Sequence, residues 1–168
     1  PVPGASSVLA ALCVAGDTGA DGFAFIGFLP AKAGERAQAL AALADRRREA
    51  LVLFEAPHRI AALLDALAAA MPGRSVTIGR ELTKQFETVA TFDAAQAPAW
   101  LAADANRSRG EFVLVLHAAP ARAADSDAQQ TAIERTLRTL LAELPLKQAV
   151  ALAATLTGAA RNRLYEQA

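Results

Sequence analysis

Residues 51–59 read Leu-Val-Leu-Phe-Glu-Ala-Pro-His-Arg, and this stretch decides the fold class. Its first four residues, Leu51 to Phe54, form a short apolar run typical of a buried β-strand. Pro57 then favours the first turn of a helix. The apolar residues that follow recur at helical spacing up to Met71, and Pro72-Gly73 ends the segment. A buried strand that passes through a polar turn into a helix is typical of α/β proteins.

Further strands and helices alternate on both sides of this stretch. Ser6 or Ser7 can cap a helix that ends at Gly16, and a second helix is expected from Ala33 to Arg48. Short apolar segments predict the strands. The segment 112–116 is apolar throughout, as is typical of a central strand, and the segment 89–92 is expected at an edge of the sheet. The strands are 23–29, 51–54, 76–79, 89–92 and 112–116, and Trp100 lies in a short helix. The alternation predicts the α/β class.

The composition changes after residue 118, which predicts a second, smaller domain. We expect an α/β domain at 1–118, a linker at 119–125 and a helical domain at 126–168. Ser126-x-x-Gln129 matches a capping box, and proline and glycine then divide the region into three helices. The apolar stripe of the first helix is Ile133, Leu137, Leu140, Leu141 and Leu144. Three helices with a glycine-containing turn indicate a helix-turn-helix-like unit.

The formal net charge of the 168 residues is zero, so overall charge gives no argument for a nucleic-acid partner. Hydrophobic residues make up 54% of the chain, which is enough for a real core. Cys13 is the only cysteine and lies in an apolar run, so we expect it to be buried and unpaired. No apolar run is long enough to span a membrane and no signal peptide is visible, so a cytoplasmic protein is expected.

Three polar clusters lie where strands end or begin, and ligands of open α/β sheets bind at strand ends. The clusters are 55–59 (Glu-Ala-Pro-His-Arg), 80–84 (Arg-Glu-Leu-Thr-Lys) with Glu87, and 107–111 (Arg-Ser-Arg-Gly-Glu). Taken singly, each has an ordinary explanation as a carboxylate at a helix N-terminus, a solvated turn or an exposed ion pair. Together they favour a polar ligand site, in which a basic side chain could hold a phosphate.

The sequence argues against several other kinds of site. His58, His117 and the single cysteine do not have the spacing of a metal-ligand set, so no metal is expected. Walker, dinucleotide-binding and serine-nucleophile motifs do not occur in the sequence. The run Arg46-Arg47-Arg48 is interpreted as the solvated end of a helix. Arg161 and Arg163 lie on the last helix of the tail, a position that slightly favours contact with RNA.

Five motifs, which occur in this order, carry a resemblance to a known family. They are Pro3-Gly-Ala-Ser-Ser7, Gly27-Phe-Leu-Pro-Ala-Lys32, Phe54-Glu-Ala-Pro-His-Arg59, Arg80-Glu-Leu-Thr-Lys84 with Glu87, and Gly110-Glu-Phe-Val-Leu114. They resemble the bacterial 16S ribosomal RNA cytidine 2′-O-methyltransferases, which belong to the tetrapyrrole methylase superfamily. The tail, from Leu144-Pro-Leu-Lys-Gln-Ala149 to Asn162-Arg-Leu-Tyr165, is similar to the C-terminal helical domain of that family.

The resemblance covers almost the whole chain and implies its fold. The family has two α/β domains, with S-adenosylmethionine in the cleft between them. This chain resembles the C-terminal one, a mixed sheet of about five strands flanked by helices, followed by the helix-turn-helix-like tail. It begins with Pro1-Val-Pro-Gly4, near the domain junction of the family, so the N-terminal domain of the same polypeptide is expected to be missing. The chain would then hold half of an active site and be inactive alone.

The resemblance also implies site residues. The cofactor would face Ser6, Ser7, Glu55, Leu82 and Glu111. A ribose 2′-hydroxyl would attack the sulfonium methyl, and Glu55, Glu81 or Lys84 would act as the base or as a positioning group. The choice among these three stays open. Arg59, Arg80 and Lys84 would suit RNA phosphates, and His58 would suit a splayed base.

Two alternatives stay in play. A methylase that acts on a small tetrapyrrole would share the α/β domain, but the helical tail and residues 80–84 suit a phosphate-bearing substrate better. The second alternative is a non-catalytic module for RNA binding or dimerisation, which would need only the surface of this chain and not a complete active site. The resemblance further implies a homodimer, to which bare apolar surface would contribute, and 16S rRNA of the small ribosomal subunit as the substrate.

Overall fold

A computed structural model describes residues 1–119 and 123–168, with the backbone alone described for 123–129. The chain divides into two compact units, Pro1–Pro120 and Ala121–Ala168, and each is described by itself. Part of the expected linker, residues 120–122, lies outside the described residues. In the part of the chain that the structure describes, no helix is both long and apolar enough to cross a membrane.

The first unit is built on a mixed five-stranded sheet with the strand order β1-β2-β5-β3-β4. Its strands are β1 (Gly22–Phe28), β2 (Glu49–Glu55), β3 (Ser75–Arg80), β4 (Thr88–Asp93) and β5 (Phe112–Leu116). β1 and β2 run parallel, whereas the other neighbouring pairs are antiparallel. β5 lies at the centre with all five residues buried, and β4 lies at an edge. The mixed α/β sheet and the positions of these two strands are confirmed.

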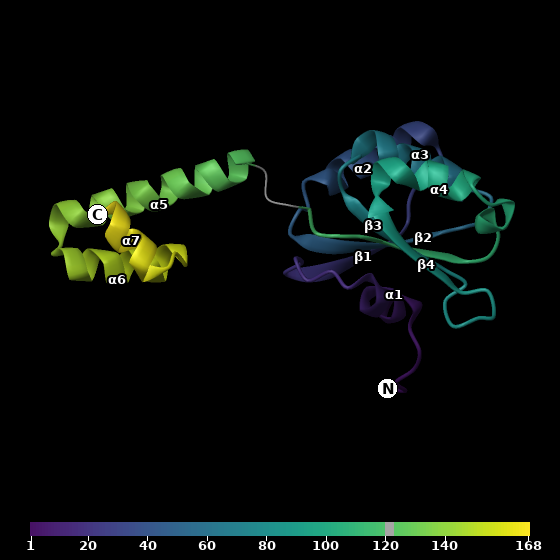
Figure 1. Ribbon diagram of the computed structural model, residues 1–168, viewed down its shortest axis with the longest axis horizontal. Coiled ribbons are helices and arrows are strands. Elements are labelled where there is room, and N and C mark those ends of the chain that lie inside the picture. Colours follow the sequence, from purple (N-terminus) through teal and green to yellow (C-terminus); the bar gives the residue numbers. More distant parts are fainter. Residues whose placement is uncertain (120–122) are drawn as a thin grey trace. The chain divides into compact units, whose positions relative to one another are not determined.

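Helices cover the two faces of the sheet unequally. α2 (Ala33–Ala44), α3 (Ile60–Ala70) and α4 (Ala97–Ala102) lie on one face, and α1 (Ser7–Ala15) lies on the other (Figure 1). Two short 3-10 helices, η1 (Ala94–Gln96) and η2 (Ala105–Ser108), flank α4. The larger core lies under the three helices, where leucines such as Leu53, Leu63 and Leu114 are fully buried. The face under α1 has a smaller core that includes Ala11, Val52 and Val115.

α1 begins and ends where the sequence predicts, but one expectation about its packing is wrong. The hydroxyl of Ser6 accepts a hydrogen bond from the backbone N–H of Leu9, and Gly16 ends the helix in the left-handed conformation. Cys13, expected to be buried, is exposed. The helix is mostly apolar and packs on the sheet through Val8, Ala11, Leu12 and Ala15, so Cys13 faces away from the core.

The helix expected from Ala33 to Arg48 ends early. α2 stops at Ala44, and β2 begins at Glu49, where it pairs with β1. Arg46–Arg48 therefore form the connection between helix and strand and do not end a helix, which corrects the earlier interpretation. Arg46 pairs with Glu49 at 2.6 Å, and Arg48 pairs with Asp21 at 2.6 Å across the connection.

The helix after β2 begins later than expected. Residues 57–59 form a turn, in which the backbone N–H of Arg59 donates to the carbonyl of Ala56 at 2.9 Å, and α3 begins at Ile60. Pro57 therefore precedes the helix and does not occupy its first turn. The side chains of His58 and Arg59 therefore extend from a tight turn at the end of the sheet.

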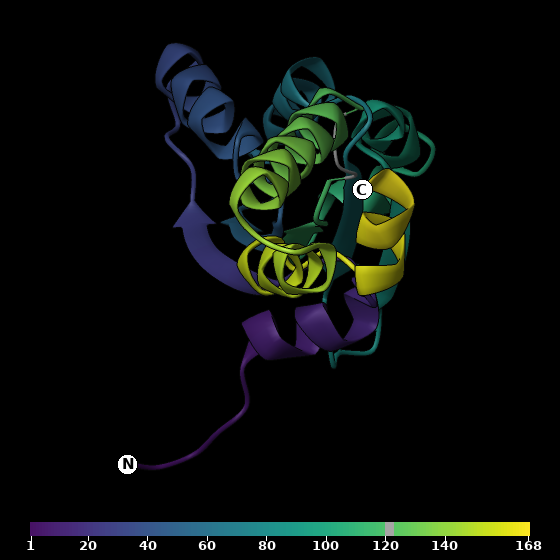
Figure 2. The ribbon, with the colours of Figure 1, turned by 90° about the vertical axis from the view of Figure 1, so that its left-hand side faces the viewer.

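The second unit consists of α5 (Ala123–Glu143), α6 (Leu146–Thr157) and α7 (Arg161–Gln167), which are shown in yellow and green in Figure 2. Its core contains Leu137, Val150, Ala153 and Leu164, and the other residues of the expected stripe in α5 are half-buried around it. α6 ends at Gly158 in the left-handed conformation. α5 begins at Ala123, ahead of the expected cap, and the side chains of the capping box Ser126-x-x-Gln129 lie outside the described residues.

Candidate functional site

The three polar clusters meet at one end of the sheet. Glu55, the last residue of β2, pairs with Phe112, the first residue of β5. Arg80, the last residue of β3, pairs with the same Phe112 from the other side. Because β5 runs antiparallel to both neighbours, its first residue lies beside their last residues. Residues 55–59, 80–84 and 107–111 therefore surround one sheet edge, although long stretches of sequence separate them.

Glu55 is the most deeply buried acidic residue at this edge. Its side chain is fully inaccessible, and its Oε1 accepts a hydrogen bond from the backbone N–H of Ala56 at 2.8 Å. The same oxygen lies 3.1 Å from Nε of Arg59, with which it forms an ion pair. The second oxygen, Oε2, is buried and has no hydrogen-bond partner among the described residues. A buried carboxylate oxygen without a partner is costly, so it favours a site where a ligand supplies the donor.

Glu55 lines a cavity of about 370 Å³. Most of the wall is apolar and comes from four different strands, from α1 and from the turn after β3. The lining residues are Ser7, Phe28, Phe54, Glu55, Ala56, Pro57, Gly79, Leu82, Glu111, Phe112 and Val113. Such a volume, with a mainly apolar wall and few polar groups, is typical of small-molecule sites. Four of the five residues expected to face a cofactor line this cavity; Ser6 is the N-cap of α1.

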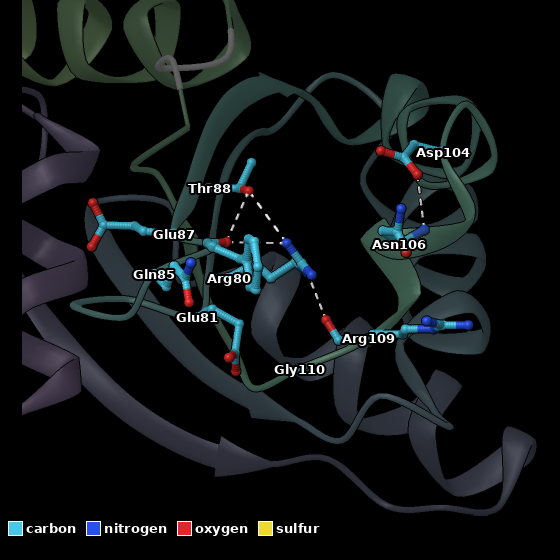
Figure 3. Close-up of a pocket in the computed structure, with 10 residues that line it drawn as sticks. Arg80, Glu81, Gln85, Glu87, Thr88, Asp104, Asn106, Arg109 and Gly110 are labelled. Carbon is cyan, nitrogen blue, oxygen red and sulfur yellow. Dashed lines mark hydrogen bonds between the residues drawn. The ribbon is translucent and has the colours of Figure 1, made fainter.

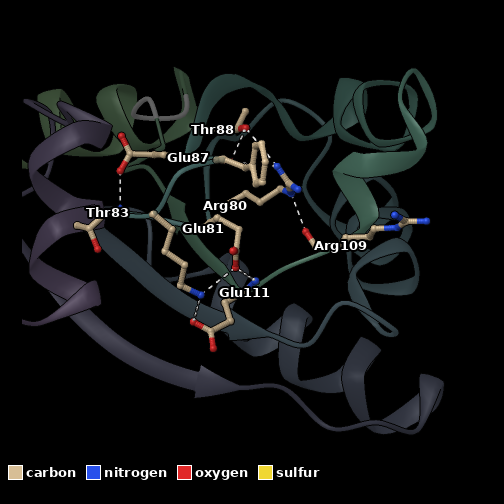
Figure 4. Close-up of polar contacts among 9 residues, drawn as sticks. Arg80, Glu81, Thr83, Glu87, Thr88, Arg109 and Glu111 are labelled. Carbon is tan, nitrogen blue, oxygen red and sulfur yellow. Dashed lines mark hydrogen bonds and ion pairs between the residues drawn. The ribbon is translucent and has the colours of Figure 1, made fainter.

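The turn after β3 has an unusual backbone. Glu81 and Thr83 have positive φ angles of 53° and 66°, which non-glycine residues adopt rarely. The backbone N–H of Thr83 donates to Glu87 at 2.6 Å, and the backbone N–H of Lys84 donates to the carbonyl of Glu81 at 3.0 Å. Figure 4 draws the polar side-chain contacts of this turn. Strained backbone of this kind persists only where surrounding contacts fix it, and it is frequent at functional sites.

Lys84 joins the turn to the residue that precedes β5. Its Nζ lies 3.0 Å from Oε1 of Glu81 and 2.9 Å from Oε2 of Glu111. Hydrogen bonds to Glu111 and Glu81 raise the pKa of Lys84 above its usual value. A hydrogen bond from the backbone of Glu111, with a second from Lys84, lowers the pKa of Glu81. Lys84 is thus held as a cation and Glu81 as an anion.

Two glycines allow this arrangement, and neither of them was assigned a role from the sequence. A Cβ on Gly110, which has a φ of 96°, would lie 2.5 Å from Cγ of Glu81. A Cβ on Gly79 would lie 3.0 Å from a methyl group of Leu82. The side chains of Glu81 and Leu82 can therefore lie directly over the neighbouring strands. Gly110 belongs to the motif Gly110-Glu-Phe-Val-Leu114, so its position was visible in the sequence, but its contact was not.

The guanidinium group of Arg80 forms hydrogen bonds within the protein. Its Nε donates to the carbonyl of Arg109 at 2.6 Å, and one terminal nitrogen donates to the carbonyl of Phe86 at 3.2 Å. These bonds tie the turn after β3 to the segment before β5. Beside them lies a second, larger pocket, between residues 80–88 and 104–110 (Figure 3). The sequence did not predict this pocket.

The remaining expected site residues have different environments. The guanidinium of Arg59 is half-buried. It donates to the carbonyl of Leu29 and pairs with Glu55, so part of its hydrogen-bonding capacity is already used. His58 is exposed on the same turn. Arg161 and Arg163 are exposed on α7 of the second unit. In the described residues, no group of three or more His, Cys, Asp or Glu side chains could hold a metal ion.

Comparison with known proteins identifies the family. The sequence profile described as tetrapyrrole (corrin/porphyrin) methylases matches residues 1–98. The chain belongs to this family. A second profile, described as the RsmI C-terminal HTH domain, matches residues 127–168 and corresponds to the helical tail. The tetrapyrrole methylase match includes the end of β2 with Glu55 and the turn after β3.

Curated relatives add a narrower name to the tetrapyrrole methylase family. Several are named ribosomal RNA small subunit methyltransferase I, including the three that follow. The protein from Neisseria meningitidis (serogroup A) is 45% identical over 168 residues, which is 100% of this chain and 56% of the relative. Those from Pseudomonas aeruginosa and Escherichia coli O157:H7 are 43% and 40% identical, and the matches cover 100% of this chain and 59% and 57% of the relatives. The chain thus spans little more than half the length of these relatives.

Solved structures support the tetrapyrrole methylase fold. The methyltransferase CobJ superposes with a TM-score of 0.52 at 19% identity, over 71% of this chain and 51% of CobJ. The cobalt precorrin-4 methyltransferase CbiF superposes with a TM-score of 0.50 at 17% identity, over 68% of this chain and 50% of CbiF. At such low identity these similarities concern the fold alone.

Proposed function

We propose that this chain provides one side of the active site of an S-adenosylmethionine-dependent enzyme that methylates the ribose 2′-oxygen of a cytidine in 16S rRNA. The observation that carries the proposal is the buried, unpartnered Oε2 of Glu55 in an apolar cavity at the sheet edge. Relatives named ribosomal RNA small subunit methyltransferase I support the choice of substrate. The activity belongs to the longer polypeptide, because the chain spans about half the length of those relatives.

The cavity fits the chemical groups of S-adenosylmethionine. Phe54 and Leu82 offer flat and apolar contacts for an adenine ring. The cofactor carries ribose hydroxyls and an ammonium group, either of which could donate to the free oxygen of Glu55. Ser6, Ser7 and Glu111 complete the proposed binding set. The two serines lie at the N-terminus of α1, where the Ser6 hydroxyl caps the N–H of Leu9 and the preceding N–H groups have no partner within the helix. When bound, the cofactor would supply an already activated methyl group.

The charge state of the turn after β3 narrows the candidates for the base. Lys84 has a raised pKa, so its ammonium group does not accept a proton near neutral pH. Glu81 has a lowered pKa, which makes it a weaker base than an ordinary glutamate. Both side chains hold the turn against Glu111. These contacts support positioning roles for Glu81 and Lys84. Glu55 has a single free oxygen, which we assign to the cofactor, so these contacts leave the proton acceptor unassigned.

The proposed RNA contacts fall into two groups. The first group already forms hydrogen bonds or ion pairs within the protein and consists of Arg59, Arg80 and Lys84. Only part of the hydrogen-bonding capacity of these side chains would therefore be available to a phosphate. His58 is exposed and free to stack on a base. In the second unit, Arg161 and Arg163 lie exposed on α7, the helix that helix-turn-helix units offer to nucleic acid.

The proposal includes partners and a location. The N-terminal domain of the same polypeptide would supply the other wall of the cofactor site. Phe23, Phe25 and Phe28 of β1 are about half exposed or more, and this apolar surface would support packing against that domain or in a homodimer. A substrate in the small ribosomal subunit would place the enzyme in the cytoplasm.

The test uses the full-length polypeptide that carries this chain. Unmodified small subunits are incubated with the protein and S-adenosylmethionine, and primer extension at low nucleotide concentration locates new 2′-O-methyl groups. We expect one new stop at a cytidine of 16S rRNA, and no stop with the Glu55→Ala variant. Methyl transfer to a tetrapyrrole instead, or no new stop with a folded protein that binds the cofactor, would contradict the proposed reaction.

A further inference from the structure

The larger pocket beside Arg80 has no role in the site described so far. Its volume is about 770 Å³, within the range of small-molecule sites. The turn after β3 separates it from the cofactor cavity, since Leu82 lines the cavity and Gln85 and Phe86 line the pocket. Its other wall is the segment 104–110, which contains η2. A ligand in this pocket would therefore lie on the other side of this turn from the proposed cofactor. Figure 3 shows the residues that line the pocket.

Phe86 is the aromatic residue of this pocket. Its side chain is 67% exposed, although the neighbouring residues of the turn are polar. Its backbone is fixed, because its carbonyl accepts hydrogen bonds from Arg80 at 3.2 Å and from the hydroxyl of Thr88 at 3.4 Å. An exposed ring on a fixed backbone offers a stacking surface at little cost in conformational entropy. Aromatic side chains of this kind bind unstacked bases of single-stranded RNA.

The polar groups of the pocket favour a neutral ligand over a phosphate. Its lining contains three carboxylates, those of Glu81, Glu87 and Asp104, against the two guanidinium groups of Arg80 and Arg109. Glu81 accepts a hydrogen bond from the backbone N–H of Glu111, and Glu87 accepts one from that of Thr83. Oδ1 of Asp104 accepts from the backbone N–H of Asn106 at 2.8 Å.

Several polar groups in the pocket stay free for a ligand. Oδ2 of Asp104 and the side-chain amides of Gln85 and Asn106 form no hydrogen bond with another described residue. The Arg109 side chain points away from Arg80 (Figure 3), and among the described residues the hydrogen bond given for Arg109 with Arg80 uses its backbone carbonyl. The free acceptor of Asp104 and the two amides match the edge of a base, on which amine and carbonyl groups alternate.

We propose that this pocket binds a nucleobase of single-stranded RNA, which stacks on Phe86 and donates its exocyclic amine to Asp104. The inference rests on the proposed function and deepens it, because it adds a substrate subsite next to the cofactor cavity. A carboxylate accepts from an amine but not from a carbonyl, so the pocket prefers cytosine, which has an amine at the position where uracil has a carbonyl. Asn106 and Gln85 complete the contacts to the base edge, and Arg109 lies at the rim.

The experiment measures the binding of fluorescein-labelled oligocytidine and oligouridine to the 168-residue chain by fluorescence anisotropy. Phe86→Leu keeps an apolar side chain but removes the ring, and it should weaken oligocytidine binding about tenfold. Phe86→Tyr keeps the ring and should bind as the wild type does. Phe23→Leu, which removes an exposed ring from β1, serves as the matched control and should change nothing.

A second variant tests the base edge. Asn is as good a helix cap as Asp, so Asp104→Asn keeps the bond to the backbone of Asn106 while it replaces the free acceptor by a donor. The wild-type chain should prefer oligocytidine by about fivefold, and Asp104→Asn should abolish that preference. Equal binding of the two oligonucleotides by the wild type, or wild-type affinity in a folded Phe86→Leu variant, would overturn the inference.

These outcomes are distinct from failure of the proposed reaction. If the full-length polypeptide methylates no ribose but oligocytidine binding depends on Phe86, the base pocket stands and the reaction does not. If the polypeptide methylates 16S rRNA and Phe86→Leu changes neither oligocytidine affinity nor the KM for the RNA, the reaction stands and the pocket does not.

Discussion

Gly110 and Glu81 approach so closely that a Cβ on the glycine would lie 2.5 Å from Cγ of the glutamate. The contact places Oε1 of Glu81 against the backbone N–H of Glu111 at 2.8 Å and within reach of Lys84. One glycine before β5 thus determines how the turn after β3 lies on the sheet edge. The cavity beside Glu55 and the pocket beside Arg80 are both lined by residues of this turn, so both depend on the same contact.

Gly110→Ala should disturb this turn. The substitution forces a side chain onto a φ of 96° and against Glu81, so it should lower the free energy of unfolding by about 1–3 kcal/mol. Urea unfolding followed by circular dichroism measures the loss. Gly34→Ala is the control, because Gly34 lies in α2 with open space around it, and this substitution should stabilise the protein slightly. Equal stability of Gly110→Ala and the wild type would contradict the account of the contact.

Arg74 should be among the residues whose loss costs most stability. It is 4% exposed, and its guanidinium donates to backbone carbonyls of segments far apart in the sequence. The acceptors are the carbonyls of Leu43, Arg46, Glu49 and His117, at 3.4, 3.1, 3.0 and 2.7 Å. Arg74→Met keeps the apolar volume but leaves buried acceptors without donors, so it should lower the free energy of unfolding by about 3 kcal/mol. Arg48→Met, at an exposed ion pair, should leave the urea midpoint nearly unchanged.

His117 should make stability depend on pH. Its Nε2 lies 2.7 Å from the hydroxyl of Thr77, and burial lowers its pKa, with a smaller contribution from Arg74 in the same direction and an opposing one from Asp17. As the pH falls below about 6.5, the unfolded chain binds the proton first, so the free energy of unfolding decreases until the lowered pKa of the folded state is reached. His117→Gln keeps a hydrogen-bonding group but cannot titrate. Urea unfolding between pH 8 and pH 5 should show a shallower decrease for this variant; an unchanged slope would exclude His117 as the cause.

Much of the fold could be predicted from local patterns. The five apolar residues 112–116 indicated a central strand because a strand buried on both faces has no polar alternation, and β5 lies at the centre. Ser6 and Gly16 marked the ends of α1 because capping chemistry is local. The motifs with Glu55 and with residues 80–84 indicated the sheet edge where the cavity lies. These features depend on neighbours in the sequence.

What could not be predicted depends on contacts between distant segments. The contact of Gly110 with Glu81 joins a residue shortly before β5 to the residue that follows β3, and the sequence around either residue does not indicate it. The exposure of Cys13 follows from how little of α1 the sheet covers, which an apolar sequence does not reveal. Arg74 lies in an ordinary turn sequence, yet its side chain bonds to four backbone carbonyls, three in residues 43–49 and one at His117. The same holds for the pocket beside Arg80, because its two walls come together only in the folded sheet.

The central claim is that Glu55 holds the cofactor, and isothermal titration calorimetry with S-adenosylmethionine tests it most directly. The full-length wild-type polypeptide should bind the cofactor. Glu55→Gln replaces a charged acceptor by a neutral amide of the same shape, so it should weaken binding about tenfold to a hundredfold in a protein that remains folded. Glu35→Gln, at an exposed carboxylate on α2, is the control and should bind as the wild type does. Wild-type affinity in a folded Glu55→Gln variant would contradict the account.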